Sequence, residues 1–323
     1  MEERRLFAGF DGGGSKTLCA LCDEEGILLG TGVGGPSNFR YCGEETARQS
    51  MRDALANAFA DAKIAPQGLF SAYVSSATIP TYGGEKYLPF FSGCVDSRQL
   101  YCEGDLYPVW YGACGDAPGI VLIAGTGSVA YLFREQSVLR AGGWGPQIGD
   151  EGSGYAIGQA AMRRVMRMYD GREPMDKAFY DCILKHYHID LATKLIAAAR
   201  EDRAMVASCA RAVCALAENG NPVAGELIAD AAGELCALIE AVLSRDTHSD
   251  ALPLVLSGGL MSENAILKES LCALLPARCP RLKSVETAKA SPALVCAALA
   301  LKMAGLTEAS ARLMRSAKGE KSC

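Results

Sequence analysis

The stretch LFAGFDGGGSKTLCAL, from Leu6 to Leu21, decides how the rest of the chain is interpreted. Its first apolar run is too short for a helix and ends at a run of glycines, and a second apolar run follows Thr17. Short apolar runs bounded by glycine are typical of β-strands. The stretch is therefore predicted to form a β-hairpin with a glycine-rich tip.

The tip of this hairpin carries groups that suit an anion. The glycines at 12–14 lack a Cβ, so their backbone N–H groups can approach phosphate, and Ser15 and Thr17 add hydroxyl groups. Asp11 would repel phosphate unless a divalent cation lay between them, and Mg²⁺ commonly binds one or two carboxylates together with substrate phosphates. Asp11 is therefore the candidate metal residue, acting through bound water.

Residues 119–133 repeat this design. An apolar run at 120–124 leads into the loop Gly-Thr-Gly-Ser at 125–128, and a second apolar run follows at 129–133. Two hairpins of one construction in one chain indicate an internally duplicated fold. Each hairpin would offer amide and hydroxyl groups to one phosphate chain, from opposite sides.

Three further positions are candidates for ligand contact. Asn38 follows Pro36 and Ser37, where a loop amide could bind a sugar hydroxyl or simply form a turn. Trp144 and Asp150 lie in the stretch 141–158, which holds seven glycines. Trp144 is equally consistent with core packing and with ligand contact, whereas for Asp150 a functional role is favoured over a turn that precedes a helix.

The remaining pattern alternates strands and helices. Residues 26–35 form a turn-rich region, and strands are expected at 71–79, at 100–102 and finally at 253–256. After the second of these strands, Asp105 can cap a helix. After the last, Ser-Gly-Gly would let a flat ring such as adenine lie against the backbone. Helices are expected at 44–62, through most of 155–245, at 291–303 and at 307–318.

Composition limits the classes of function. The chain has 323 residues, enough for two domains, a net charge of −5 and no basic stripe, so nucleic acid is not an expected partner. No apolar run reaches membrane-spanning length and no targeting segment is visible, so a cytoplasmic protein without a membrane partner is expected. The 14 cysteines are scattered, as is typical of reduced, buried thiols.

Four motifs together resemble a known family. The sequences DGGGSKT from Asp11, IAGTGS from Ile123, GGWGPQIGDEGSGY from Gly142 and LSGGL from Leu256 closely resemble the N-acetylglucosamine kinase and BadF-type ATPase family. This family is part of the sugar kinase, heat-shock ATPase and actin superfamily, and the resemblance spans nearly the whole chain.

The resemblance implies a fold and an assembly. It implies an α/β chain with a duplicated ribonuclease H-like, actin-like ATPase fold, in which two domains close over a central cleft. The N-terminal domain would be residues 1–116, completed by a helix at about 306–318, and the C-terminal domain residues 117–305. Family members often pair through the C-terminal domain, so a homodimer is expected.

The resemblance also implies ATP and Mg²⁺ as cofactors and a small-molecule amino sugar as substrate, phosphorylated on its 6-hydroxyl. Asp105 matches the catalytic aspartate, although Gly104-Asp105-Leu106 stands where the family often has Asn-Asp-Ala, which leaves Asp96 and Asp116 as rivals. The implied sugar contacts are Asn38, Thr126, Trp144, Gly145 and Asp150. The implied nucleotide contacts are Gly13, Gly14, Ser15, Thr17, Gly127, Gly258 and Gly259.

Alternatives remain at this level. N-acetylglucosamine, N-acetylmuramic acid and glucosamine all fit as substrates. A BadF-type ATPase that activates a 2-hydroxyacyl-CoA dehydratase or benzoyl-CoA reductase would share a [4Fe-4S] cluster across a dimer, with two cysteines from each subunit. Cys94, Cys102 and Cys114 are the candidates expected nearest the interdomain region. A sugar-sensing repressor would need a DNA-binding helix-turn-helix, and only five residues precede the first strand.

Overall fold

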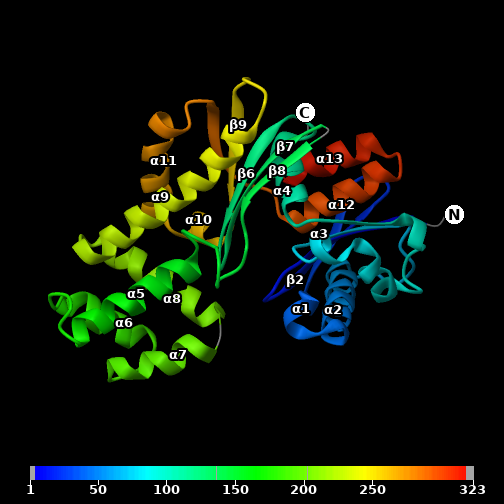
Figure 1. The fold of residues 1–323 in the computed structure, drawn as a ribbon. Coiled ribbons are helices and arrows are strands. Elements are labelled where there is room, and N and C mark those ends of the chain that lie inside the picture. The colour runs from blue at the N-terminus through cyan, green and yellow to red at the C-terminus, as the bar shows by residue number, and fades with distance from the viewer. Residues whose placement is uncertain (1–3, 136, 202, 318–323) are drawn as a thin grey trace. The chain divides into compact units, whose positions relative to one another are not determined.

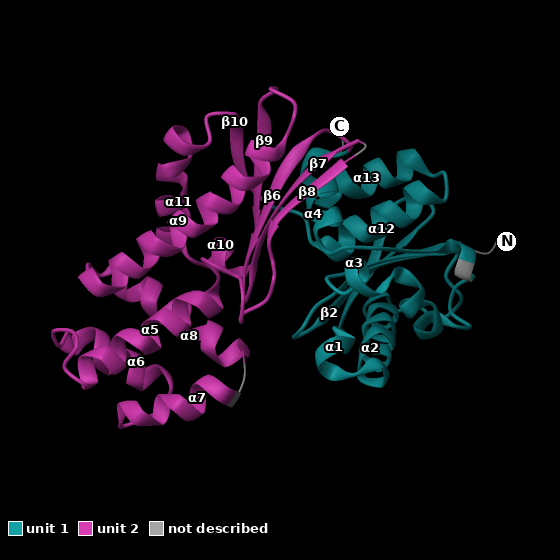
Figure 2. Cartoon of the chain, in the orientation of Figure 1, with its two compact units in different colours: residues 1–115, 288–323 teal, residues 116–287 magenta. Residues whose placement is uncertain are grey.

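The computed structural model describes residues 4–135, 137–201 and 203–317 (Figure 1). The chain divides into two compact units, residues 1–115 with 288–323 and residues 116–287, which Figure 2 shows in teal and magenta. Each unit contains one five-stranded sheet with helices packed against it. In the described part of the chain, no helix is both long and apolar enough to span a membrane.

The first unit has the strand order β3-β2-β1-β4-β5. Strands β1 and β2 form the predicted hairpin, with Gly12 opposite Thr17, and β4 and β5 continue the sheet parallel to β1. Its elements are β1 (Leu6–Gly12), β2 (Thr17–Asp23), β3 (Leu28–Gly34), α1 (Phe39–Cys42), α2 (Glu44–Ala62), β4 (Ser71–Ser76), α3 (Ile79–Tyr82), two 3₁₀ helices (Gly84–Phe91 and Ser97–Gln99), β5 (Leu100–Glu103), α4 (Leu106–Cys114), α12 (Pro292–Met303) and α13 (Thr307–Ala317).

The second unit repeats this arrangement with the order β10-β9-β6-β7-β8. Again the central strand pairs with an antiparallel hairpin partner on one side and with a parallel strand on the other, so the predicted duplication is confirmed. Its elements are β6 (Gly119–Ala124), β7 (Ser128–Arg134), β8 (Ser137–Gly142), α5 (Gly154–Tyr169), α6 (Lys177–His186), a 3₁₀ helix (Ala192–Lys194), α7 (Leu195–Glu201), α8 (Arg203–Glu218), α9 (Pro222–Arg245), β9 (Leu252–Ser257), α10 (Gly259–Glu263), α11 (Ala265–Arg278) and β10 (Leu282–Thr287).

The region predicted as turn-rich, residues 26–35, instead holds strand β3. Its glycines recur every second residue, at 30, 32 and 34, and all three face helix α2. A Cβ built on Gly32 would lie 2.0 Å from the carbonyl oxygen of Ala54 in that helix. The glycines therefore keep a strand and a helix in direct backbone contact, and they do not mark a turn.

Helix α12 lies in the first unit, whereas residues 288–305 were predicted to belong to the C-terminal domain. It packs on the face of the first sheet that carries Phe7, while α2 covers the face that carries Ala8. Gly9 makes this possible, because a Cβ there would lie 2.0 Å from the backbone nitrogen of Ala297. The sheet is thus buried on both faces, which explains the near-continuous apolar sequence of β1.

Two strands of the second unit were missed. Strand β8 is half-exposed, and β10, an edge strand, reads LKSVET, in which four of the six residues are polar. The strand at 252–257 is therefore not the last one, since β10 pairs with it in parallel. Helix α10 begins directly at Gly259, and the predicted helices at 44–62, 291–303 and 307–317 are present. Residue 318 lies outside the described residues.

Candidate active site

The carboxyl ends of three parallel strands meet at one edge of the first sheet. Asp11 near the end of β1 is level with Ser75 of β4, and Ser75 is level with Glu103 of β5. Asp105 follows Glu103 by two residues, at the N-cap of α4. The parallel register therefore brings the two aspartates, which are far apart in the sequence, to the same sheet edge.

The two carboxylates affect each other. Burial raises the pKa of Asp11 to about 6, and the charge of the neighbouring Asp105 raises it too. Two groups oppose this effect on the pKa: Ser75, whose Oγ donates to Asp11 Oδ1 at 3.5 Å, and the Lys16 ammonium. The side chain of Asp105 makes no capping hydrogen bond to α4. A pair of partly desolvated carboxylates that repel each other is a donor set suited to a hard divalent cation.

The rival aspartates differ in their surroundings. Asp96 is an exposed residue that caps a short 3₁₀ helix, and it forms an ion pair with Arg98 at 2.8 Å. Asp116 is exposed and lies between α4 and β6, at the start of the second unit. Neither rival directly follows a strand of the first sheet, as Asp105 follows β5.

The first hairpin tip presents Gly14 and Ser15 to solvent. A Cβ on Gly14 would meet no atom within 4 Å, so its backbone is open to a ligand. Thr17, at the other end of the tip, is enclosed. Its side chain is fully buried, and its hydroxyl donates to Gly35 O at 2.8 Å and lies 2.7 Å from Ser37 Oγ. The Thr17 hydroxyl thus holds the hairpin tip against the following loop.

The surroundings of Asn38 are consistent with both roles considered for it, a turn-forming residue and a ligand contact. Its Oδ1 accepts from Arg40 N and caps helix α1, and its backbone N–H donates to Gly13 O at 3.1 Å. The capping role explains the turn-like sequence. The Nδ2 group makes no hydrogen bond among the residues that the structure describes, so it is available to a ligand.

In the second unit, the tip of the β6–β7 hairpin is held against the start of α5. Gly154 N donates to Gly125 O at 2.8 Å, and Tyr155 N donates to Thr126 O at 3.3 Å. The side chain of Thr126 is exposed, as a ligand contact requires. At the same sheet edge, Gly258 has a φ of 94° and lies so close to Ala124 that a Cβ would be 2.4 Å from its carbonyl oxygen.

Asp150 is a buried charge with a partner that the sequence did not reveal. It is 3% exposed, has a left-handed φ of 60°, and forms an ion pair with Arg203 at the start of α8. Gly127 makes room for this pair, because a Cβ there would lie 2.7 Å from Arg203 Nη2 and 3.0 Å from Asp150 Oδ2. Arg203 stands in an uninterrupted helical pattern, so the sequence offers no signal of its role.

Trp144 is not a core residue. Its side chain is 61% exposed, and the Arg140 guanidinium lies 4.4 Å from the ring centroid. Gly145 follows with a φ of 92°, a conformation that favours glycine. An exposed aromatic ring on a glycine-rich loop is a group that can pack on a sugar ring.

Two copies of one mixed sheet, each with a glycine-tipped hairpin at its centre, define the duplicated α/β fold of actin-like ATPases and sugar kinases. The chain belongs to the BadF/BadG/BcrA/BcrD ATPase family, whose sequence profile matches residues 8–288.

Relatives and a solved structure agree with this. The chain is 26% identical over 315 residues to an N-acetyl-D-glucosamine kinase from Dictyostelium discoideum, covering 92% of this chain and 98% of the relative. It is 25% identical to an N-acetylmuramic acid/N-acetylglucosamine kinase from Clostridium acetobutylicum, covering 86% of this chain and 92% of the relative. A solved protein from Chromobacterium violaceum, whose proposed assignment is N-acetylglucosamine kinase, superposes with a TM-score of 0.76 at 27% identity, covering 92% and 99% of the two chains.

Proposed function

We propose that this chain is an ATP-dependent amino-sugar kinase that phosphorylates the 6-hydroxyl of N-acetylglucosamine or of a close relative such as N-acetylmuramic acid or glucosamine. Family membership implies the use of ATP, and the two relatives matched over most of their length are named as kinases of such sugars. The observation that carries the proposal is the placement of Asp105 beside Asp11 at the carboxyl ends of parallel strands.

Asp105 acts as the general base. Its carboxylate accepts the proton of the sugar 6-hydroxyl while that oxygen forms a bond to the γ-phosphorus. The bond from this phosphorus to the oxygen bridging the β- and γ-phosphates breaks, and ADP leaves. Phosphoryl transfer requires little covalent chemistry from the protein. Much of the contribution of Asp105 to catalysis is therefore the positioning of the sugar hydroxyl.

Asp11 would hold a divalent cation, through bound water. When bound, Mg²⁺ supplies charge neutralisation to the phosphate oxygens. The fit rests on the raised pKa of Asp11, since a cation near it would offset the burial and the repulsion from Asp105. Gly13 and Gly14 let the loop approach the phosphate closely, and the exposed Gly14 N–H and Ser15 hydroxyl donate hydrogen bonds to it, while the Gly13 N–H closes the turn by donating to Lys16 O.

The second unit supplies the remaining groups for nucleotide and sugar. Gly127, Gly258 and Gly259 give backbone surfaces that a nucleotide can approach closely. For the sugar, Trp144 offers a ring face, and Asp150, held by Arg203, offers carboxylate oxygens to ring hydroxyls. Thr126, Gly145 and Asn38 complete the proposed sugar contacts.

Oligomeric state and location are also part of the proposal. The chain forms a homodimer and works in the cytoplasm, where its many thiols remain reduced. Sedimentation of the purified protein at micromolar concentration checks the first point, and a single species of monomer mass would contradict it.

A coupled ATPase assay over a panel of hexoses tests the function. N-acetylglucosamine, N-acetylmuramic acid or glucosamine should stimulate ADP release, and the product should carry phosphate on oxygen 6. Absence of stimulation by every hexose derivative would refute the kinase. A brown, iron-containing protein after anaerobic purification would instead support the activator of a dehydratase.

A further inference from the structure

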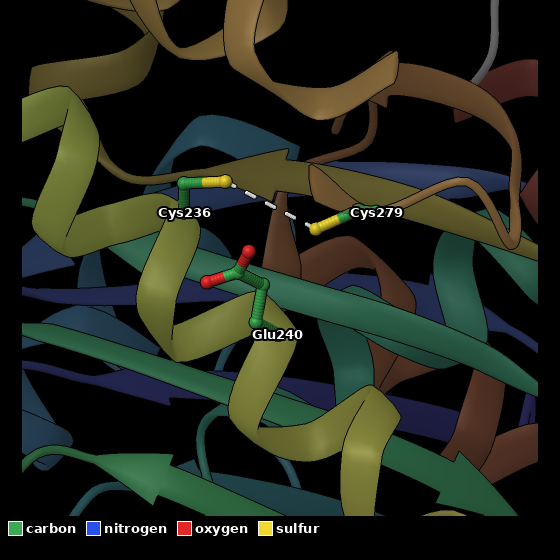
Figure 3. Close-up of side chains that lie close together, drawn as sticks. All are labelled: Cys236, Glu240 and Cys279. Atoms are coloured by element: carbon green, nitrogen blue, oxygen red, sulfur yellow. Dashed lines mark hydrogen bonds between the residues drawn. The ribbon is translucent and has the colours of Figure 1, made fainter. Parts of the chain in front are cut away.

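Two thiols and a carboxylate gather in the second unit, apart from the strand ends described above. Cys236 and Glu240 lie one turn apart on helix α9, and Cys279 follows helix α11 directly (Figure 3). One ligand atom from each lies within 4.8 Å of the others. In the described part of the chain, these three form the group of potential metal ligands that meets this distance limit.

Local structure fixes the three positions. A separation of four residues on a helix places Cys236 and Glu240 on the same face. Cys279 is the C-cap of α11, and its N–H donates to Leu275 O at 2.8 Å, which holds its backbone in place. Both thiols are nearly fully buried, at 0% and 1% exposure. The Glu240 side chain is 33% exposed, so an ion and a water molecule can reach the group from that side.

The distance between the two sulfur atoms distinguishes a metal from a disulfide. Cys236 Sγ and Cys279 Sγ are 4.0 Å apart. A tetrahedral zinc ion with Zn–S bonds of about 2.3 Å holds two sulfur atoms roughly 3.8 Å apart. A disulfide needs about 2.05 Å. The observed spacing is therefore close to that of a zinc site and would have to shrink by half to form a disulfide.

The surrounding charge also suits a dication. Arg278 forms a two-point ion pair with Glu240, in which Nε donates to Oε1 at 2.8 Å and Nη2 donates to Oε2. Hydrogen bonds of this kind commonly orient carboxylates that bind metals. Two thiolates, one carboxylate, one guanidinium and Zn²⁺ sum to zero net charge, which a largely buried group requires.

We propose that Cys236, Glu240 and Cys279 form a zinc site that joins helix α9 to the segment leading into β10, with water as the fourth ligand. Soft thiolates with one carboxylate select Zn²⁺ over Mg²⁺, which prefers oxygen ligands. The site lies outside the catalytic groups and serves stability. It does not depend on the proposed kinase activity, and its test does not use that activity.

The test is metal binding by the full chain. The protein is stripped with a chelator under reducing conditions and then titrated with Cd²⁺ in excess Mg²⁺, which occupies oxygen-only sites. One equivalent of Cd²⁺ should produce the ultraviolet charge-transfer band of a thiolate-bound metal, and Zn²⁺ should abolish the band by competition. Zn²⁺ alone should raise the unfolding temperature by several degrees, because it binds the folded state.

The control is a second pair of buried thiols in the same unit. Cys209 and Cys214 lie on α8 at 0% and 2% exposure. The variant C236S/C279S should lose the band and the stabilisation by Zn²⁺, whereas C209S/C214S should keep both. No band in the wild-type chain, or a band of equal strength in C236S/C279S, would overturn the proposal. A mass lower by two hydrogens that reductant restores would show a disulfide and overturn it too.

A milder substitution tests the site even if the double variant misfolds. Replacing Arg278 with Gln removes the ion pair to Glu240 but leaves all three ligands in place. The affinity for Zn²⁺ should fall by about 10- to 100-fold, as is typical when the hydrogen-bond partner of a ligand is lost. Unchanged affinity in R278Q would contradict the supporting role that the site gives to the Arg278–Glu240 ion pair.

Discussion

The ion pair between Asp150 and Arg203 gives a sharp test of how the second unit is built. Replacing Arg203 with Met keeps the length of the side chain but removes its charge. The carboxylate of Asp150 is then left in a site where only 4% of it is exposed. Since a buried charge without a partner is costly, the R203M variant should be destabilised.

The size of the effect follows from the exposure of the two partners. Breaking a buried pair by removing one member costs about 3–5 kcal/mol. The Arg203 side chain is 30% exposed, so water screens part of this interaction, and we expect about 2–3 kcal/mol. For a unit of this size, that corresponds to a fall in unfolding temperature of about 4–12 °C.

A matched control lies on the same helix. Arg211 pairs with Glu263 at 2.9 Å, but their side chains are 71% and 51% exposed. R211M should therefore change stability by less than about 0.5 kcal/mol. Urea unfolding followed by both circular dichroism and fluorescence measures each variant, and D150N/R203M should recover part of the loss. Equal stability of R203M and R211M would refute the reasoning.

Three further predictions use the same structural observations. Ionised Asp11 destabilises the folded state, because burial and Asp105 raise its pKa to about 6. Without Mg²⁺, D11N should therefore be more stable than the wild type at pH 7.5, by about 1–3 kcal/mol. The difference should shrink towards pH 4, where Asp11 of the wild type is protonated in the folded state. Urea unfolding at several pH values checks this, and a difference that grows on acidification would contradict it. G258A should destabilise the chain by about 1–3 kcal/mol more than G220A. Both glycines have a positive φ, but only at Gly258 would an added Cβ overlap a neighbouring backbone. Equal losses of stability by calorimetry would disprove the overlap. Binding of N-acetylglucosamine should change the fluorescence of exposed Trp144, and a change that persists in W144F would assign the signal elsewhere.

The elements predicted correctly are those whose burial pattern is strong. The first strand of each hairpin is almost wholly buried, and the helix at 44–62 buries one apolar face. Strand β3 was missed because its glycines, which are usually turn signals, serve here as a contact face for α2. Strand β10 was missed because an edge strand exposes much of its length and therefore lacks an apolar run.

Some residues of the candidate site can be recognised from the local sequence, and others cannot. Glycines and charged residues at strand ends can be found from the sequence, because the order of strand and loop is local. Interaction partners that come from distant segments of the chain cannot be found in this way. Arg203 is 53 residues from Asp150, and the burial of the Thr17 hydroxyl against Gly35 depends on how the next strand returns. The assignment of α12 to the first unit likewise depends on Gly9, whose missing side chain makes space for a helix almost 290 residues later.

The most direct test of the account is the turnover of D105N with ATP and the amino sugar that stimulates the wild type. If Asp105 is the base, this variant should fold and bind ATP normally while turnover falls by about 10²–10⁴-fold, and D96N should stay near wild type because Asp96 is tied to Arg98 at the surface. Turnover of D105N within tenfold of the wild type would contradict the account.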